Sequence, residues 1–255
     1  MRQIIAVIPA RMASTRFPGK PLQKMLGVPM IGHCYQRAKM ALGKDNVWVA
    51  TCDQEITTYI QSIGGNAVMT SVHHQRACTR ASEALSMLEK IEDDDIVVVI
   101  QGDEPLISPS AIESVVAPFF NEDISIANLL SIITNDVKFR DKNNVKAVIS
   151  EQSNLMYLSR EAIPSDWTEV NPKRRLLQTG VIAFTVEALM RFNEQEETYL
   201  EKIESIDINR ALERGERVKG VVMETPTLGV DTHEELLEAE QMLLADPVTR
   251  LYLDG

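Results

Sequence analysis

MRQIIAVIPARMASTRFPGKP, residues 1–21, opens with the apolar run Ile4–Ile8, which ends at Pro9. The run is too short for a buried helix, and its Ile and Val residues are typical of a buried strand. Cations, hydroxyl groups and the turn at residues 18–21 follow it directly. Because open α/β sheets bind ligands at the carboxyl ends of their strands, this order predicts a site for a polyanion. An ordinary surface loop with solvated cations is the alternative.

Further segments of the first hundred residues alternate between strand and helix patterns. Strands are predicted at 46–51, 66–70 and 95–101, and helices at 30–42, 53–63 and 77–91, with Asp53 as an N-cap. The segment 95–101 reads DIVVVIQ, an almost unbroken β-branched run of the kind found in parallel sheets. Strands that alternate with helices predict an α/β fold with a doubly wound, mostly parallel sheet.

A second part of the fold is expected after residue 120. Strands are predicted at 125–133, 145–150, 154–158 and 178–184, without long helices between them. This pattern indicates a smaller, mixed β subdomain. We therefore expect a single domain over 1–255, with a core formed by 1–120 and 216–245 and an inserted subdomain at about 121–215.

Composition narrows the classes of function. The 255 residues are 44% hydrophobic and 25% charged, as in a soluble globular protein. A formal net charge of −11 disfavours nucleic acid as a partner. No apolar run reaches the roughly 18 residues of a membrane span, and no signal peptide is evident. Three scattered cysteines form neither a metal-binding spacing nor a disulfide framework. We expect a cytoplasmic protein that binds no membrane.

Polar residues also follow the strand at 95–101. Gln101-Gly102-Asp103-Glu104-Pro105 places a carboxylate at the tip of a central strand, where ligands bind. Mg²⁺ is often held by one or two carboxylates together with substrate phosphates. The alternative is a turn or N-capping Asp before the next helix. The neighbouring pair His73-His74 is read as polar loop residues rather than as metal ligands, because no cysteine or carboxylate pattern lies nearby.

The opening motif is neither a P-loop nor a G-x-G-x-x-G dinucleotide loop. Residues 8–21 instead resemble I-P-A-R-x-x-S-[ST]-R-x-P-G-K-P, the signature of the 3-deoxy-manno-octulosonate cytidylyltransferase (CMP-Kdo synthetase) family of sugar nucleotidylyltransferases. Residues 101–105 match that family's Q-G-D-E-P, and residues 230–236 its V-D-T-x-E-D-L. Residues 69–80 resemble its M-T-x-x-x-H-x-S-G-T-[DE]-R, and residues 157–164 its Y-F-S-R-x-x-I-P.

The resemblance implies a Rossmann-like fold of the nucleotide-diphospho-sugar transferase type, and a role for each matching residue. CTP would be bound by Pro9, Ala10, Arg11, Ser14, Thr15, Arg16, Lys20, Thr70, Ser71 and Arg80. Arg11, Lys20 and Asp103 would act in catalysis, and Asp103 and Asp231 would bind Mg²⁺. The sugar acid would be contacted by Gln101, Arg160, Gln178 and Asp207. The same resemblance implies a homodimer, with the subdomain at its interface, and a role in lipopolysaccharide or surface polysaccharide synthesis. Read without it, Asp231 is the N-cap of a helix that begins at Thr232.

Three groups of residues depart from the family pattern. Residues 76–79 replace S-G-T-[DE], Gln178 stands in place of a His, and Asp207-Ile208 stand in place of Glu-Gln. A neutral Gln can hydrogen-bond a carboxylate but supplies no charge. These departures fall on the sugar side, whereas the triphosphate motif is intact. We therefore expect a 3-deoxy-2-ulosonic acid other than plain Kdo as acceptor.

The resemblance thus implies in-line attack of the acceptor's anomeric hydroxyl on the α-phosphorus of CTP, with release of pyrophosphate and without a protein nucleophile. Two alternatives stay open. One is a nucleotidylyltransferase for another acidic sugar or a polyol phosphate, and the other is a non-catalytic paralogue that binds nucleotide or sugar.

Overall fold

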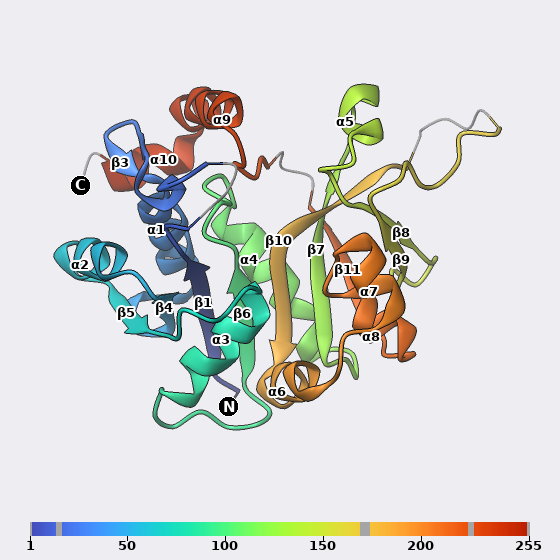
Figure 1. Cartoon of the computed structure of the whole chain (residues 1–255), viewed down its shortest axis with the longest axis horizontal. Coiled ribbons are helices and arrows are strands. Elements are labelled where there is room, and N and C mark those ends of the chain that lie inside the picture. The colour runs from blue at the N-terminus through green and yellow to red at the C-terminus, as the bar shows by residue number, and fades with distance from the viewer. Residues whose placement is uncertain (1, 14–16, 169–173, 224–226, 254–255) are drawn as a thin grey trace.

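The computed structural model describes residues 2–13, 17–168, 174–223 and 227–253. Four parallel strands form its N-terminal half. β1 (Ile4–Ala10) lies between β6 (Ile96–Ile100) and β4 (Val47–Thr51), and β5 (Asn66–Met69) pairs with β4. Figure 1 shows these strands side by side. Because they are parallel, the residues that follow β1 and β6 meet at one edge of the sheet.

Antiparallel pairing extends the sheet beyond β6. β10 (Leu176–Thr185) is antiparallel to both β6 and β7 (Ile126–Ile132), and β11 (Val218–Met223) is parallel to β7. The strand order is β11-β7-β10-β6-β1-β4-β5 in a sheet of nine strands. β7 and β10 thus belong to the main sheet, because an antiparallel strand can join it without a crossover helix.

The remaining two strands of the sheet form a hairpin at one end of the molecule. β8 (Lys146–Ile149) and β9 (Leu155–Ser159) are antiparallel, and β8 also pairs with the start of β10. The short helices α7 (Tyr199–Glu204) and α8 (Asn209–Glu213) lie beside this hairpin (Figure 1). The predicted α/β class is confirmed: a large, mostly parallel sheet with helices carries a smaller mixed part.

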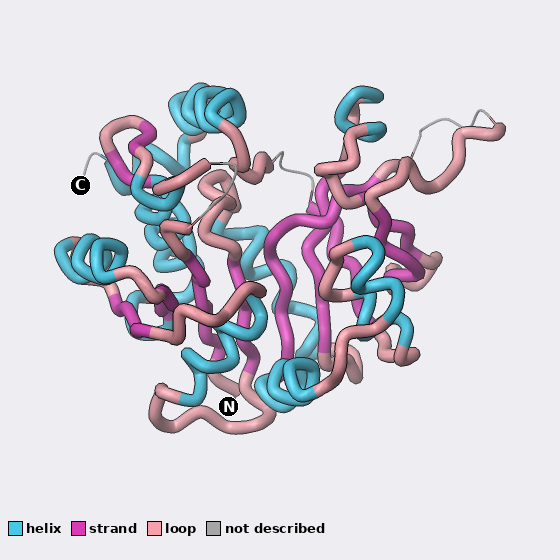
Figure 2. Tube along the Cα trace, viewed as in Figure 1, coloured by secondary structure: helices cyan, strands magenta, loops and turns pink. Residues whose placement is uncertain are grey.

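Helices cover both faces of the sheet, as Figure 2 shows. α1 (Met30–Leu42) and α4 (Pro109–Val116) pack on one face with Ala6 and Ile8 of β1. α3 (Ala77–Ser86) and α6 (Val186–Glu194) pack on the other with Ile5 and Val7. The alternation along β1 follows from the two-residue period of a strand. The other elements are α2 (Gln54–Ser62), α5 (Asp136–Arg140), the 3₁₀ turns η1 (Lys20–Leu22), η2 (Lys44–Asn46) and η3 (Ala117–Phe120), and the two-residue strands β2 (Lys24–Met25) and β3 (Val28–Pro29).

Residues 246–253, to which the sequence assigns no element, pack against α1, and we call this contact the clasp. α9 (His233–Ala245) is followed by α10 (Pro247–Leu253), which packs on α1. The fully buried Arg37 of α1 donates to Asp246 Oδ2 at 2.5 Å and to Thr249 Oγ1 at 2.8 Å.

Among the helices of the described residues, none combines the length and the apolar composition of a membrane span.

Two expected helix boundaries are wrong. Thr232, not Asp231, is the N-cap of α9, and it forms a capping box with Glu235. A hydroxyl three residues before a carboxylate satisfies both free amides, and this releases Asp231 for another contact. α3 ends at Ser86 rather than at 91, since turns and bends follow and the φ of +62° at Lys90 is incompatible with a right-handed helix.

Candidate active site

The loop after β1 is held in place by backbone contacts. Gly19, with a φ of +71°, donates its N–H to the carbonyl of Met12 at 3.1 Å. The N–H of Met12 donates to Asp53 Oδ2 at 2.7 Å. Asp53 is the N-cap residue of α2, as predicted, but its carboxylate makes no capping bond and anchors this loop instead. The predicted nucleotide-binding residues Ser14, Thr15 and Arg16 lie outside the described residues.

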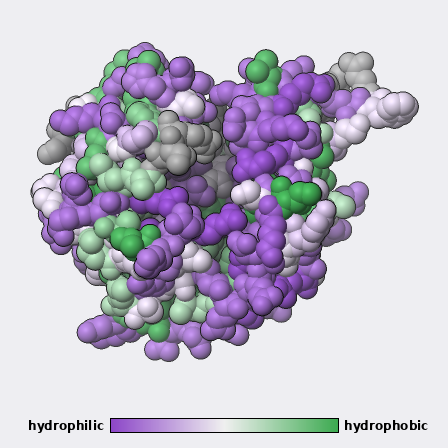
Figure 3. All heavy atoms as spheres, in the orientation of Figure 1, coloured by the Kyte–Doolittle hydropathy of each residue, from purple (hydrophilic) through white to green (hydrophobic). Residues whose placement is uncertain are grey.

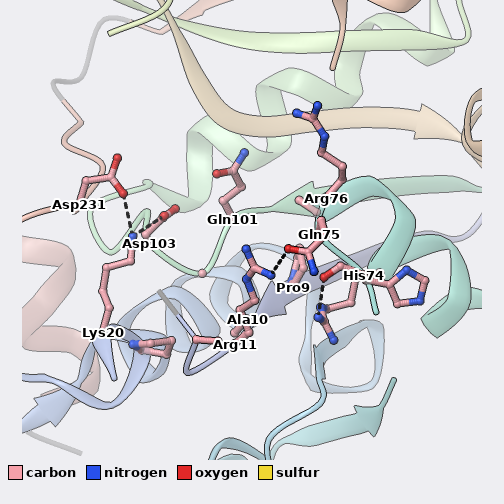
Figure 4. Close-up of a pocket in the computed structure, with 15 residues that line it drawn as sticks. Pro9, Ala10, Arg11, Lys20, His74, Gln75, Arg76, Gln101, Asp103 and Asp231 are labelled. Carbon is pink, nitrogen blue, oxygen red and sulfur yellow. Dashed lines mark hydrogen bonds and ion pairs between the residues drawn. The ribbon is translucent and has the colours of Figure 1, made fainter. Parts of the chain in front are cut away.

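Lys20 joins the two predicted metal carboxylates. Its buried Nζ donates to Asp103 Oδ2 at 2.8 Å, to Asp231 Oδ1 at 3.0 Å and to the carbonyl of Val230 at 2.6 Å (Figure 4). Burial lowers the pKa of Lys20, but the attraction of Asp103 and Asp231 outweighs it and leaves the pKa above its ordinary value. The fold thus brings together three charged groups that lie more than 80 residues apart in the sequence.

The pair Asp103 and Asp231 can be tested as a cation site. Both carboxylates contact one ammonium group, so their oxygens already face a common positive charge. Among the described residues, no group of three or more His, Cys, Asp or Glu side chains could hold a metal ion. Two carboxylates fit Mg²⁺ only when substrate phosphates and water supply its other oxygens. The two carboxylates alone therefore do not complete a coordination shell for Mg²⁺.

A cavity of about 310 Å³ opens above these groups. Pro9, Ala10 and Arg11 at the end of β1 line it, together with Lys20, Asp103 and Asp231. Figure 3 shows the hollowed, largely hydrophilic face in this part of the molecule. Arg11 is half-buried, and its Nη1 donates to Gln75 Oε1 at 2.9 Å. Cations and strand ends therefore meet as the opening motif predicts.

Arg80 organises the loop on the other side of this cavity. Its buried guanidinium donates to Thr70 Oγ1 at 2.6 Å and to the carbonyls of Ser71 and His74 at 3.2 Å. Arg80 lines the cavity, whereas Thr70 and Ser71 lie behind it. His74 contacts Glu83 Oε2 at 2.5 Å. This contact gives the His74 side chain a partner within its own loop and helix.

A second cavity, of about 590 Å³, adjoins the first. Seven residues line both: Arg11, Gln75, Arg76, Ala77, Gln101, Asp103 and Asp231. We call these seven the junction. Gly180 of β10 approaches closely here, because an added Cβ would lie 2.9 Å from Cβ of Gln101 and 3.0 Å from Glu104 Oε1.

Glu104 ties the junction to β10. It is 5% exposed, and it accepts hydrogen bonds from the N–H of Gly180 at 2.7 Å and from Thr227 Oγ1 at 3.2 Å. Burial raises the pKa of Glu104 to about 7, although the bond from Gly180 opposes the rise. Glu104 therefore connects three segments around Asp103, a role that sequence reasoning missed.

All four predicted acceptor residues line the larger cavity. Gln101 is also at the junction, and Gln178 donates Nε2 to Asn128 Oδ1 at 2.7 Å. The guanidinium of Arg160 donates to the carbonyls of Lys142, Glu204 and Ser205. These bonds fix the turn between α7 and α8, so Arg160 has a structural contact set in addition to its position in the cavity wall.

Arg76 was not predicted as a site residue, yet it lines both cavities. It donates Nη1 to Asp207 Oδ1 at 2.7 Å and Nη2 to Glu197 Oε1 at 3.4 Å. Residues 76 and 207 are two of the departures from the family pattern. Their opposite charges were the available signal, but nothing in the sequence places them in contact.

Comparisons with known proteins show the family of this chain. A family model described as cytidylyltransferase matches residues 5–218. The 8-amino-3,8-dideoxy-manno-octulosonate cytidylyltransferase of Shewanella sp. (strain W3-18-1) is 37% identical over 245 residues, which cover 95% of this chain and 99% of that protein.

Solved structures show the same fold. The structure of CMP:2-keto-3-deoxy-manno-octonic acid synthetase complexed with CTP has a TM-score of 0.86 and 31% identity, and the match covers 95% of this chain and 99% of the other. A cytidylyltransferase from Leptospira borgpetersenii, with a TM-score of 0.64, 18% identity and coverage of 96% and 88%, shares the fold alone. The extent of these matches, together with the family model, shows that the chain belongs to the cytidylyltransferase family.

Proposed function

We propose that this enzyme transfers CMP from CTP to the anomeric hydroxyl of a 3-deoxy-2-ulosonic acid. The observation that carries the proposal is the pair of adjoining cavities that share the junction. The first, with cations and strand ends, suits CTP, and the second suits a small sugar acid. The relatives with extensive matches are named for such acids.

The nucleotide side has the groups that a triphosphate requires. We assign Arg11 and Lys20 to phosphate oxygens, since Arg supplies a fork of donors and Lys a compact charge. Asp103 and Asp231 would hold Mg²⁺, which when bound neutralises phosphate charge and lowers the pKa of the attacking hydroxyl. Lys20, already held by both carboxylates, would stabilise the charge that develops on the departing pyrophosphate.

The reaction needs only positioning and neutralisation of charge. The acceptor's hydroxyl oxygen bonds to the α-phosphorus, the bond from that phosphorus to the bridging oxygen breaks, and pyrophosphate leaves with the electron pair. The hydroxyl proton passes to solvent. The junction residues Gln101 and Gln75 can orient the acceptor there.

The charge of the larger cavity restricts the class of acceptor that it can bind. Among the described residues that line it, seven are acidic and four are basic. Such a wall disfavours an acceptor that carries only a carboxylate, and it favours one that also carries an ammonium group. We therefore propose an amino-substituted acid of the type for which the Shewanella relatives are named.

We also propose a cytoplasmic homodimer that serves surface polysaccharide synthesis. Large apolar side chains are exposed on α5 (Val137, 76%), on β9 (Met156, 62%) and in the segment that follows β9 (Trp167, 94%). Exposed apolar side chains of this size favour an interface between two copies. The mass of the protein in solution, by light scattering, should be twice that of the chain, and a single-chain mass would contradict the dimer.

Pyrophosphate release tests the function. The protein is incubated with Mg²⁺ and CTP over a panel of 2-ulosonic acids, including Kdo and its 8-amino analogue, with UTP as the nucleotide control. Pyrophosphate release that requires CTP and is faster with the 8-amino analogue than with the other 2-ulosonic acids would support the proposal. Silence with every acid, in protein that binds CTP, would favour a binding paralogue or an acceptor of another class.

A further inference from the structure

We propose that Arg76 binds the carboxylate of the acceptor and that Asp207 positions Arg76 for it. The inference rests on the proposed function, because it assumes that a 2-ulosonic acid occupies the larger cavity. It goes beyond the expected site residues, among which Arg76 has no place.

The chemistry of the acceptor fixes where its carboxylate must lie. In a 2-ulosonic acid the carboxyl carbon is bonded to the carbon that bears the reacting hydroxyl. That hydroxyl has to reach the α-phosphorus at the junction, where the two cavities meet. The acceptor carboxylate therefore lies at the junction too, close to Asp103 and Asp231. A third carboxylate beside these two requires a cation nearby.

Only two of the seven junction residues are cations, Arg11 and Arg76. Arg11 follows β1 directly, on the side of Lys20 and the predicted triphosphate loop. Arg76 lies at the start of α3, and Figure 4 shows Gln101 between it and Asp103. Arg76 is therefore the cation placed on the acceptor side of the reacting groups.

The other cations that line the two cavities already have partners. Lys20 is bound to Asp103 and Asp231. Arg80 is buried among the oxygens of its own loop. Lys138 pairs with Glu238 at 3.1 Å, and Arg160 donates to three backbone carbonyls. Among the described residues, none of these four cations lines both cavities, so Arg76 is the cation at the acceptor side of the junction.

Arg76 keeps free donors although it is ion-paired. An arginine has five N–H donors, and the bonds to Asp207 and Glu197 use two of them. Asp207 comes from the turn between α7 and α8, so its bond draws the guanidinium across the wall of the larger cavity. The first amides of α3, which follow Arg76, also favour an anion at this point.

The pair also accounts for two departures from the family pattern together. A Ser-to-Arg change at 76 alone would add an unbalanced cation, and a shorter acid at 207 would retreat from the cavity. Joined at 2.7 Å, they supply a positively charged fork at the junction. Position 178, in the wall of the same cavity, has the neutral Gln178 where the family pattern has a His, so Arg76 supplies a positive charge where Gln178 does not.

The test compares an acid acceptor with its neutral carboxamide in wild type, Arg76→Gln and Arg76→Ser. Wild type should prefer the acid, and we expect either substitution to raise the KM for the acid about 10- to 100-fold, the size of a charged hydrogen bond. The KM for the carboxamide and for CTP should change by less than about threefold, so the preference for the acid collapses. Arg76→Ser retains an N-cap residue for α3, which guards against a folding failure.

A matched control is Arg217→Gln, which removes the same charge from an exposed pair with Glu122. Its acid preference should equal that of wild type. If the Arg76 variants keep the wild-type preference for the acid, Arg76 does not bind the carboxylate. If they lose affinity for CTP instead, Arg76 binds the nucleotide. Absence of pyrophosphate release by wild type with every acid would instead reject the proposed function.

Discussion

The nucleotide side and the acceptor side of the site are built in different ways. On the proposed nucleotide side, Arg11 directly follows β1 and Asp103 is the third residue after β6, and the register of these buried parallel strands sets where both residues lie. On the acceptor side, Arg160, Gln178 and Asp207 come from β9, β10 and the turn between two short helices. A parallel sheet fixes the first set, whereas the second comes from separate segments that are joined by antiparallel pairing and by side-chain contacts.

This difference leads to different expectations for substitutions on the two sides. The backbone of its strand dictates the position of a residue at a strand tip, and the proposed phosphate contacts restrict its chemistry. The acceptor wall can be altered in pairs, as Arg76 and Asp207 show. We therefore expect the two sides to respond differently to substitution.

The largest expected effect is that of Asp103→Asn on the nucleotide side. The variant loses a charge that would hold Mg²⁺, so we expect kcat/KM to fall about 10⁴-fold, equivalent to about 5.5 kcal/mol. Mn²⁺ binding in the presence of CTP, measured by electron paramagnetic resonance, should weaken in parallel. The circular dichroism spectrum should match wild type. Near-normal activity would remove Asp103 from the metal site.

Glu201→Gln should disturb the acceptor side without comparable loss at the nucleotide side. Glu201 is fully buried and binds Arg210 with both oxygens, at 2.7 and 2.6 Å. A buried guanidinium left without its counter-charge costs about 3 kcal/mol. Urea unfolding should show that loss, and the KM for the acceptor should rise more than the KM for CTP. The reason is that Glu201 lies in α7 and Arg210 in α8, the two helices that precede and follow Asp207.

The surface pair Glu187–Arg191, at 3.5 Å, supplies the control for that measurement. Glu187→Gln should change the free energy of unfolding by less than about 0.5 kcal/mol. If Glu201→Gln costs no more than this control, the buried pair does not hold the acceptor side together.

The same contrast sets how far the sequence alone could predict the molecule. The strand at 95–101 and the position of Asp103 follow from a β-branched run and the rule for strand ends. The membership of β7 and β10 in the main sheet could not be predicted, because hydrophobic pattern shows that a strand exists but not which neighbour it pairs with. Nor could the contact of Arg76 with Asp207, since 131 residues separate them and only the fold brings them together. Asp231 was placed one residue wrongly in its helix because two adjacent residues could each serve as the N-cap.

The smallest expected effect concerns the clasp of α10 on α1, behind the nucleotide side. His33 is fully buried, with Nδ1 2.6 Å from the hydroxyl of Tyr252 and Nε2 2.9 Å from the carbonyl of Met25. Burial lowers the pKa of His33, although the bond with Met25 opposes this. The folded protein therefore holds a neutral ring, while the unfolded chain binds a proton below a pH of about 6.5. The stabilisation is present above that pH and is lost as the pH falls toward the folded pKa, with a slope of at most about 1.4 kcal/mol per pH unit.

In His33→Gln this component should vanish, so the wild-type free energy of unfolding should fall more steeply than the variant's between pH 7 and 5. The exposed His73, changed to Gln, should leave the wild-type slope intact. Equal slopes in all three proteins would mean that the clasp does not depend on a neutral His33, and that the support behind the nucleotide side comes from Arg37 and apolar packing alone.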